Sequence, residues 1–263
     1  MDITSRDNRF IREYRHLIAD GKYRRRTGCF ALEGARLCSD AVLSCVTVET
    51  VLFTARAKQQ YPTHTEMVRA AAPAYEISDA LADFISDTTA PQGLFCICRM
   101  PAEAPSWDTL STDRCYAALE SVQDPGNLGT MIRTAEAFGL GGLLLSDGCC
   151  DPYNPKVLRS SMGGVFRLPL FDAGQLSHRL LTLSKAGFRT VACVVDAEAS
   201  PIQTLTLGGG TIAVIGNEGN GLTPETVAAC SHCATIPMAG RAESLNASMA
   251  AGIVFWEMMR KDR

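Results

Sequence analysis

The second half of the chain alternates continuously apolar runs with helical stretches, and this alternation restricts the fold more than any other feature. The run TVACVVD at residues 190–196 and the run TIAVIG at residues 211–216 are β-branched or apolar at nearly every position. Strands that are apolar on both faces are typical of a parallel sheet covered by helices on each side. Residues 114–263 are therefore predicted to form an α/β domain around a parallel sheet.

The same periodicity places the elements of this domain along the chain. Strands are expected at 115–121, 142–145, 190–195, 211–215 and 235–237, with helices at 127–138, 155–162, 175–186 and 224–229. A last helix is predicted from the apolar stripe of Leu245, Met249, Gly252, Ile253, Trp256 and Met259. Its first residues are unusual, because the stretch ESLNASMAAG combines polar groups with residues that have almost no side chain.

Residues 1–100 form a smaller α/β domain in this interpretation. One apolar face, which includes Phe10, Tyr14 and Leu17, predicts a first helix, and strands follow near 29–32, 48–53, 74–77 and 93–99. Residues 101–113 lack periodicity and are predicted to be a linker. The chain of 263 residues, 46% hydrophobic, is long enough for two domains with cores of their own.

Charge is distributed unevenly between the two parts. The formal net charge is -3, yet residues 1–36 hold nine basic and five acidic side chains, which leaves a local charge of +4 and about -7 elsewhere. An excess of arginine at one end indicates a surface that faces a polyanion.

The eleven cysteines are interpreted as buried, reduced thiols. Their number is odd, their spacing is irregular, and several lie in apolar runs such as FCIC at 95–98. Cys230 and Cys233 have the spacing of half a zinc site, but no matching second half exists, so no metal is expected. Without a secretory signal or an apolar run of the roughly 20 residues that a membrane span needs, a cytoplasmic location is expected.

Three loops after predicted strands collect polar residues and glycines, and ligands of open parallel sheets bind at such loops. The first is SVQDPGNLGTMIR, the second is VIGNEGNGL, and the third is IPMAGRAESLNAS. The first two of these loops contain several glycines but do not fit a dinucleotide or phosphate fingerprint. No Lys-Ser/Thr pair follows their glycines, and Glu218 in the second loop would repel a phosphate.

Together these loops resemble the three ordered motifs of the SpoU/TrmH family of RNA ribose methyltransferases, in the SPOUT superfamily. The matching positions are Asn127, Gly129 and Arg133, then residues 216–221, then Ile236, Met238 and residues 243–248. Upstream, the stretch KYRRRTGCFALEGARL is similar to the start of the family's small RNA-binding domain.

The resemblance implies a SPOUT-type domain with a trefoil knot, which works as a homodimer through the C-terminal domain. It also implies methyl transfer from S-adenosylmethionine to a ribose 2′-hydroxyl in structured RNA. Ribosomal RNA is favoured over transfer RNA, because a separate basic domain precedes the catalytic one. The alternatives are a tRNA ribose methyltransferase, an RNA base methyltransferase of the same superfamily, and an RNA-binding protein without activity.

The resemblance also assigns roles to individual residues. Catalytic roles fall to Arg133, Asn127, Glu218, Ser244 and Asn246, and cofactor binding to Gly216, Ile236, Leu245, Asn217 and Met238. Glu218 is expected to hold Arg133 through a bidentate contact. Helix capping is the alternative role for Asn127 on its own helix and for Ser244 or Asn246 on the last helix. The residues expected to bind RNA are Arg9, Arg24, Arg26, Arg36 and Lys156.

Overall fold

The chain forms two compact units in the computed structural model, which describes residues 2–260. The N-terminal unit consists of residues 2–103 and Asp151–Phe166, and the C-terminal unit consists of Ala104–Cys150 and residues 167–260. The sequence-based boundaries of 1–100, 101–113 and 114–263 remain a prediction. They assign residues 151–166 to the second domain, whereas the structure groups this segment with the first unit.

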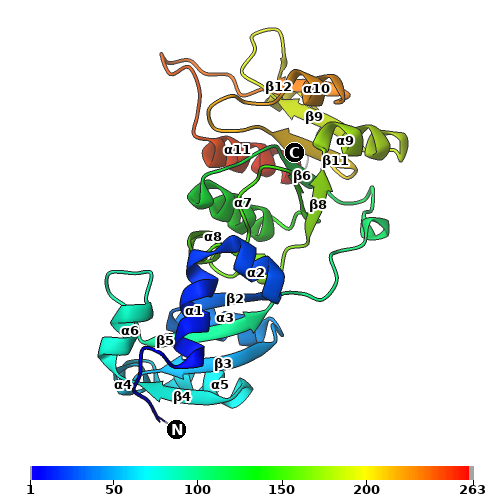
Figure 1. Ribbon diagram of the computed structural model, residues 1–263. Coiled ribbons are helices and arrows are strands. Elements are labelled where there is room, and N and C mark those ends of the chain that lie inside the picture. Colours follow the sequence, from blue (N-terminus) through cyan, green and yellow to red (C-terminus); the bar gives the residue numbers. More distant parts are fainter. Residues whose placement is uncertain (1, 261–263) are drawn as a thin grey trace. The chain divides into compact units, whose positions relative to one another are not determined.

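The N-terminal unit is built on a five-stranded mixed sheet with the order β1-β4-β3-β5-β2 (Figure 1). Strands β1, β4 and β3 are parallel, and β5 runs antiparallel to both β3 and β2. The strands are β1 Asp2–Ile3, β2 Cys29–Glu33, β3 Val48–Phe53, β4 Ala74–Ile77 and β5 Leu94–Arg99. The helices are α1 Arg9–Ala19, α2 Gly21–Thr27, α3 Ala35–Leu43, α4 Ala55–Gln60, α5 Pro62–Ala71, α6 Asp79–Ile85, α8 Pro155–Ser161 and the short η2 Gly164–Phe166.

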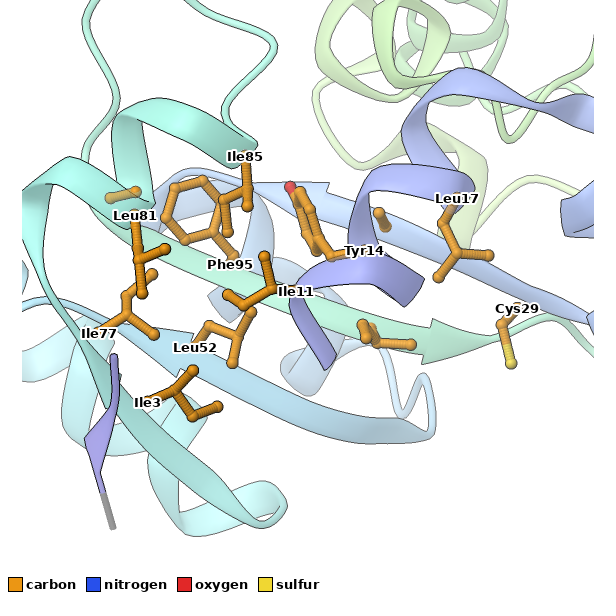
Figure 2. Close-up of a cluster of buried hydrophobic side chains, with 13 residues drawn as sticks. Ile3, Ile11, Tyr14, Leu17, Cys29, Leu52, Ile77, Leu81, Ile85 and Phe95 are labelled. Carbon is orange, nitrogen blue, oxygen red and sulfur yellow. The ribbon is translucent and has the colours of Figure 1, made fainter. Parts of the chain in front are cut away.

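The core of this unit follows from the apolar face of α1. Figure 2 shows Ile11 and Tyr14 next to Leu52 and Phe95 of the sheet, with Leu17 at the other end of the same cluster towards Cys29. Ile11, Tyr14, Leu17, Leu52 and Phe95 are at most 1% exposed. The Tyr14 hydroxyl donates to the Leu32 carbonyl at 3.1 Å, which satisfies its buried polar end. The helix predicted from this apolar pattern is confirmed.

Residues 151–166 pack on β2 even though they lie between two strands of the C-terminal unit in sequence. The Tyr153 ring lies 4.8 Å from that of Phe30, and Asp151 forms an ion pair with Arg24 at 2.7 Å. Both contacts join residues that are far apart in sequence, so no local sequence pattern could predict them.

The C-terminal unit is built on a seven-stranded sheet with the order β10-β12-β9-β11-β6-β7-β8, and every pairing in it is parallel. The parallel sheet predicted from the sequence is confirmed. The strands are β6 Tyr116–Leu119, β7 Leu143–Ser146, β8 Leu170–Gly174, β9 Arg189–Cys193, β10 Ser200–Pro201, β11 Thr211–Ile215 and β12 His232–Thr235. The helices are η1 Trp107–Thr109, α7 Pro125–Ala137, α9 Leu176–Lys185, η3 Ile202–Thr204, α10 Pro224–Ala228 and α11 Ala247–Met259.

Several elements differ from the sequence-based expectation, among them β8, β12 and α11. Strand β8 was missed, because the alternating burial of Leu170–Gly174 lacks a continuous apolar run. Strand β12 covers His232–Thr235 and so begins three residues before the strand expected at residues 235–237. Helix α11 begins at Ala247 because Asn246 caps it, so Leu245 precedes the helix and does not belong to its apolar stripe. No helix among residues 2–260 is long and apolar enough to cross a bilayer.

Candidate active site

The loops after β6 and β11 leave neighbouring strands at the same edge of the sheet, since β6 and β11 pair in parallel. The first loop runs into α7, where Asp124 is the N-cap and accepts from the amide of Asn127 at 2.8 Å. Pro125 occupies the first turn, where its missing N–H costs no hydrogen bond. Asp124 therefore caps the helix, and the side chain of Asn127 remains available for another contact.

Glu218, on the loop after β11, provides that contact. Its Oε1 accepts from Asn127 Nδ2 at 3.0 Å and from the amide of Asp124 at 3.2 Å, and its Oε2 accepts from the amide of Gln123 at 3.3 Å. Burial alone would raise the pKa of Glu218, but the hydrogen bonds from Asn127 and the backbone amides outweigh it and lower that pKa. The charged carboxylate of Glu218 thus fixes the position of the loop after β6.

Asn246 brings in the third loop. Its Oδ1 accepts from the amides of Ser248 and Met249 at 2.9 and 3.2 Å and so caps α11. Its Nδ2 donates to Asn127 Oδ1 at 3.0 Å. Asn246 is therefore a helix cap and part of the site at once, and Glu218, Asn127 and Asn246 form one chain of hydrogen bonds, here called the Asn127 cluster.

Two further ties hold the loop after β11 in place. Asn217 Nδ2 donates to the Ser121 carbonyl at 2.7 Å. Glu120, only 8% exposed, accepts from the amide of Thr223 at 2.8 Å and from the hydroxyls of Thr223 and Thr226. Sequence reasoning missed Glu120, although a carboxylate at the end of a buried apolar strand was a signal for such a buried acceptor.

Gly216 shows why glycine is needed where β11 enters this loop. A Cβ at this position would lie 2.2 Å from the Gly221 carbonyl carbon and 2.4 Å from the Leu222 nitrogen. The two backbone segments could not approach in this way with any larger residue.

A cavity lies beside the third loop. Among the residues expected to bind the cofactor, Ile236, Met238 and Leu245 line it, and Ser244 lines it too. Gly216 and Asn217 do not line the cavity and lie instead on the neighbouring loop after β11. The other lining residues, which sequence reasoning missed, are Cys193, Val194, Val195, Ile202, Ala234, Thr235, Ala250 and Val254. None of the lining side chains carries a formal charge at neutral pH, as suits a flat apolar ring recognised by backbone groups.

Arg133 contradicts one expectation. Its side chain is exposed on α7, and within residues 2–260 it makes no hydrogen bond or ion pair. The expected contact between Glu218 and Arg133 is wrong, because both carboxylate oxygens of Glu218 are used by Asn127 and by backbone amides.

Two thiols of this unit, Cys193 and Cys230, have pKa values raised by burial. Burial raises the pKa of Cys193 to about 12 and that of Cys230 to about 12, and charge repulsion among these thiols and Cys233 adds to the effect. In the described residues, no group of three or more His, Cys, Asp or Glu side chains is arranged to hold a metal ion.

The arginines expected to bind RNA differ in their surroundings. Arg24 is 3% exposed, pairs with Asp151 and donates to the Leu17 carbonyl at 2.6 Å. Its guanidinium has no surface to offer RNA, so its expected role is wrong and Arg24 is a structural residue. Arg9, Arg26, Arg36 and Lys156 are exposed, with Arg9 over the ring of Phe10 and Arg26 over the ring of Tyr23.

Each of the two units matches a known protein family. Residues 114–256 match the SpoU rRNA Methylase family, and residues 8–96 match the MRM3-like substrate binding domain. The chain is 30% identical over 256 residues to the 23S rRNA (guanosine(2553)-2'-O)-methyltransferase RlmP of Bacillus subtilis, covering 97% of this chain and 98% of that protein. It is 31% identical over 270 residues to the 23S rRNA (uridine(2479)-2'-O)-methyltransferase of Streptomyces viridochromogenes, covering 98% and 92%. The AdoMet-bound rRNA methyltransferase from Sinorhizobium meliloti superposes with a TM-score of 0.85 at 29% identity, covering 98% and 97%.

Proposed function

The chain belongs to the SpoU rRNA methylase family, and on that premise we propose that it methylates a ribose 2′-hydroxyl of ribosomal RNA with S-adenosylmethionine as the donor. The observation that carries the proposal is the Asn127 cluster, which joins three loops next to an uncharged cavity. Ribosomal RNA is the preferred substrate because the relatives that cover nearly the whole chain, N-terminal unit included, are named for acting on 23S rRNA.

The residues of the cavity fit the methyl donor. Ile236, Met238 and Leu245 offer apolar surface to an adenine. S-adenosylmethionine supplies a methyl group on a sulfonium whose positive charge is lost on transfer. A wall without charged side chains does not oppose that loss.

Arg133 is the residue that acts on the acceptor. A guanidinium is a poor general base, because it stays protonated in proteins. It can bind the phosphate next to the acceptor ribose and stabilise the negative charge that develops on the 2′-oxygen. Its exposure and its lack of a partner among residues 2–260 support this role.

The Asn127 cluster positions the acceptor. Glu218 orients the amide of Asn127, and Asn246 fixes its other end, so the amide has one orientation. A fixed amide on the same helix as Arg133 is suited to hold the ribose or its phosphate. Ser244, exposed on the cavity wall, is placed to contact the donor or the acceptor.

A homodimer through the C-terminal unit belongs to the same proposal. Helix α11 exposes 62% of Met249, 55% of Trp256 and 37% of Ile253, all on the helix that follows the cavity loop. Exposed apolar side chains gathered on one helix support a protein interface. The trefoil knot remains an expectation that rests on the family, and the cytoplasmic location remains an expectation from the sequence.

Methyl transfer to unmodified large-subunit ribosomal RNA tests the proposal directly. The purified protein is incubated with this RNA and radiolabelled S-adenosylmethionine, and the product is hydrolysed with alkali. A methylated 2′-oxygen protects its 3′ phosphodiester, so the label is expected in alkali-resistant dinucleotides. Label released as mononucleotides would identify a base methyltransferase, and binding of RNA without any transfer would identify an inactive protein.

A further inference from the structure

The N-terminal unit contains a cavity of about 330 Å³ that the catalytic proposal does not use. Glu33, Arg36 and Leu37 line it from the end of β2 and from α3, Thr88 and Ala90 from the loop before β5, and Arg159 and Met162 from α8. We propose that this cavity, here called the Arg36 pocket, takes one unstacked nucleotide of the RNA substrate. The inference rests on the proposed function and deepens it.

The walls of the Arg36 pocket are held by hydrogen bonds. Glu33 accepts from the hydroxyls of Ser86 and Thr88 at 2.6 Å each and from the amide of Asp87 at 3.0 Å. The carboxylate that ends β2 therefore fixes the loop on the opposite wall. A pocket whose walls are fixed before binding loses little entropy when a ligand enters.

A second contact fixes the first turn of α3. Gln92 Oε1 accepts from the Ala35 amide at 2.7 Å, and Gly34 has a φ of +106°, in the region that favours glycine. This arrangement gives the Glu33-Gly34 pair of the sequence a physical reason: one residue holds the loop, and the next turns the chain into the helix.

The chemistry of the lining matches a nucleotide. Leu37, Ala90 and Met162 supply apolar surface, which suits the face of a base. Met162 is 40% exposed, and its φ of +48° is that of the left-handed C-cap that ends α8. Proteins that read RNA bind single nucleotides in this way, with the base splayed out of its stack.

Two guanidinium groups at the pocket suit the two polar and planar parts of a nucleotide, the phosphate and the base. Arg36 is exposed and makes no hydrogen bond or ion pair within residues 2–260. Arg159 is held by Asp87 at 2.8 Å, with 32% of its side chain exposed. Arg36 is thus available to a phosphate, while Arg159 offers a fixed planar group on which a base can stack.

The test uses two variants that change the pocket in different ways. Ala90 is exposed, so Ala90→Trp fills the cavity without disturbing the core, and Arg36→Ala removes the cation. Thr89→Trp is the matched control for bulk on the same loop, because Thr89 is exposed and does not line the cavity. Lys58→Ala, on α4, is the control for charge.

Methylation of protein-free, unmodified large-subunit ribosomal RNA is measured for each variant. Ala90→Trp is expected to raise the KM for RNA by about 10-fold, since stacking of one base supports an effect of this size. Arg36→Ala is expected to raise it by about two- to threefold, the share of one phosphate contact, and kcat at saturating RNA should stay within about twofold in both variants. Affinity for S-adenosylmethionine, measured by calorimetry, is expected to stay at the wild-type value. Arg36→Ala should also lower the log-log salt slope of RNA binding by about 0.7 to 0.9.

Several outcomes would overturn the inference. Wild-type KM in both pocket variants would exclude a nucleotide in the pocket, and so would an equal loss in Thr89→Trp. A loss seen with ribosomal particles but not with protein-free RNA would identify a protein as the occupant. If wild-type protein methylated no RNA at all, the proposed function would fail, and that result is distinct from normal activity in the pocket variants.

Discussion

The Asn127 cluster and the basic surface of the N-terminal unit both consist of polar side chains that stand out in the sequence, but they are held in different ways. In the cluster, side chains from three loops bond to one another, so each fixes the next. In the N-terminal unit, Arg9 and Arg26 each lie over an aromatic ring on their own helix, and Arg36 has no partner within residues 2–260. A linked set is expected to respond to a single substitution as a whole, whereas separate cations contribute separately.

The largest expected effect concerns Arg133, which stands apart from the cluster. Arg133→Ala should reduce kcat by about 10³-fold, because a group that stabilises the developing oxyanion is lost. Affinity for S-adenosylmethionine should not change, since Arg133 does not line the cavity. Single-turnover methylation and calorimetry measure the two quantities.

Arg133→Lys separates charge from geometry at the same position. If a positive charge is sufficient, the lysine variant should keep measurable activity. Complete inactivity of the lysine variant would show that the planar guanidinium or a proton transfer is required, and the role proposed for Arg133 would have to be revised.

Arg24 shows that the basic residues themselves divide into structural and exposed groups. Arg24→Met should lower the free energy of unfolding of the N-terminal unit by about 3 kcal/mol, because Asp151 is left mostly buried without its partner. The double variant Arg24→Met, Asp151→Leu should recover most of this loss. Denaturant unfolding measures the stability, and a fully stable single variant would contradict the structural role.

Within the cluster, Glu218→Gln is expected to reduce kcat/KM by about 10-fold. A glutamine keeps the size but offers only one acceptor oxygen to the three donors of Asn127, Asp124 and Gln123, so hydrogen bonds are lost. Activity near that of wild type would show that the cluster does not position the acceptor.

The pH dependence of stability tests the same hydrogen bonds. The pKa of Glu218 is lowered in the folded chain, so its stabilisation is complete above the unfolded pKa of about 4.3 and is lost as pH falls through the lowered pKa. The difference in unfolding free energy between wild type and Glu218→Gln should be constant above about pH 5 and narrow below about pH 4. A difference independent of pH would contradict the assignment.

The contrast between the two regions also explains what the sequence could predict. A parallel sheet brings the carboxyl ends of its strands to one edge, so the strand pattern was enough to direct attention to the loops that carry Asn127 and Glu218, but not to their contact. The partner of Glu218 was predicted wrongly, because spacing shows which loops converge but not which donors reach a carboxylate. Arg24 was misassigned for a related reason: its burial depends on Asp151, which lies far along the chain.

The smallest expected effect concerns a single exposed arginine. Arg26→Ala should weaken binding of ribosomal RNA by only about two- to threefold and lower the log-log salt slope by about 0.7 to 0.9, the share of one phosphate contact. Arg9→Ala should behave alike, and the double variant should show the sum of the two changes, because the two side chains lie on different helices and share no partner. Filter binding at several salt concentrations measures the slope. A loss in the double variant well beyond that sum would mean that these cations act as a linked set, and the contrast with the Asn127 cluster would not hold.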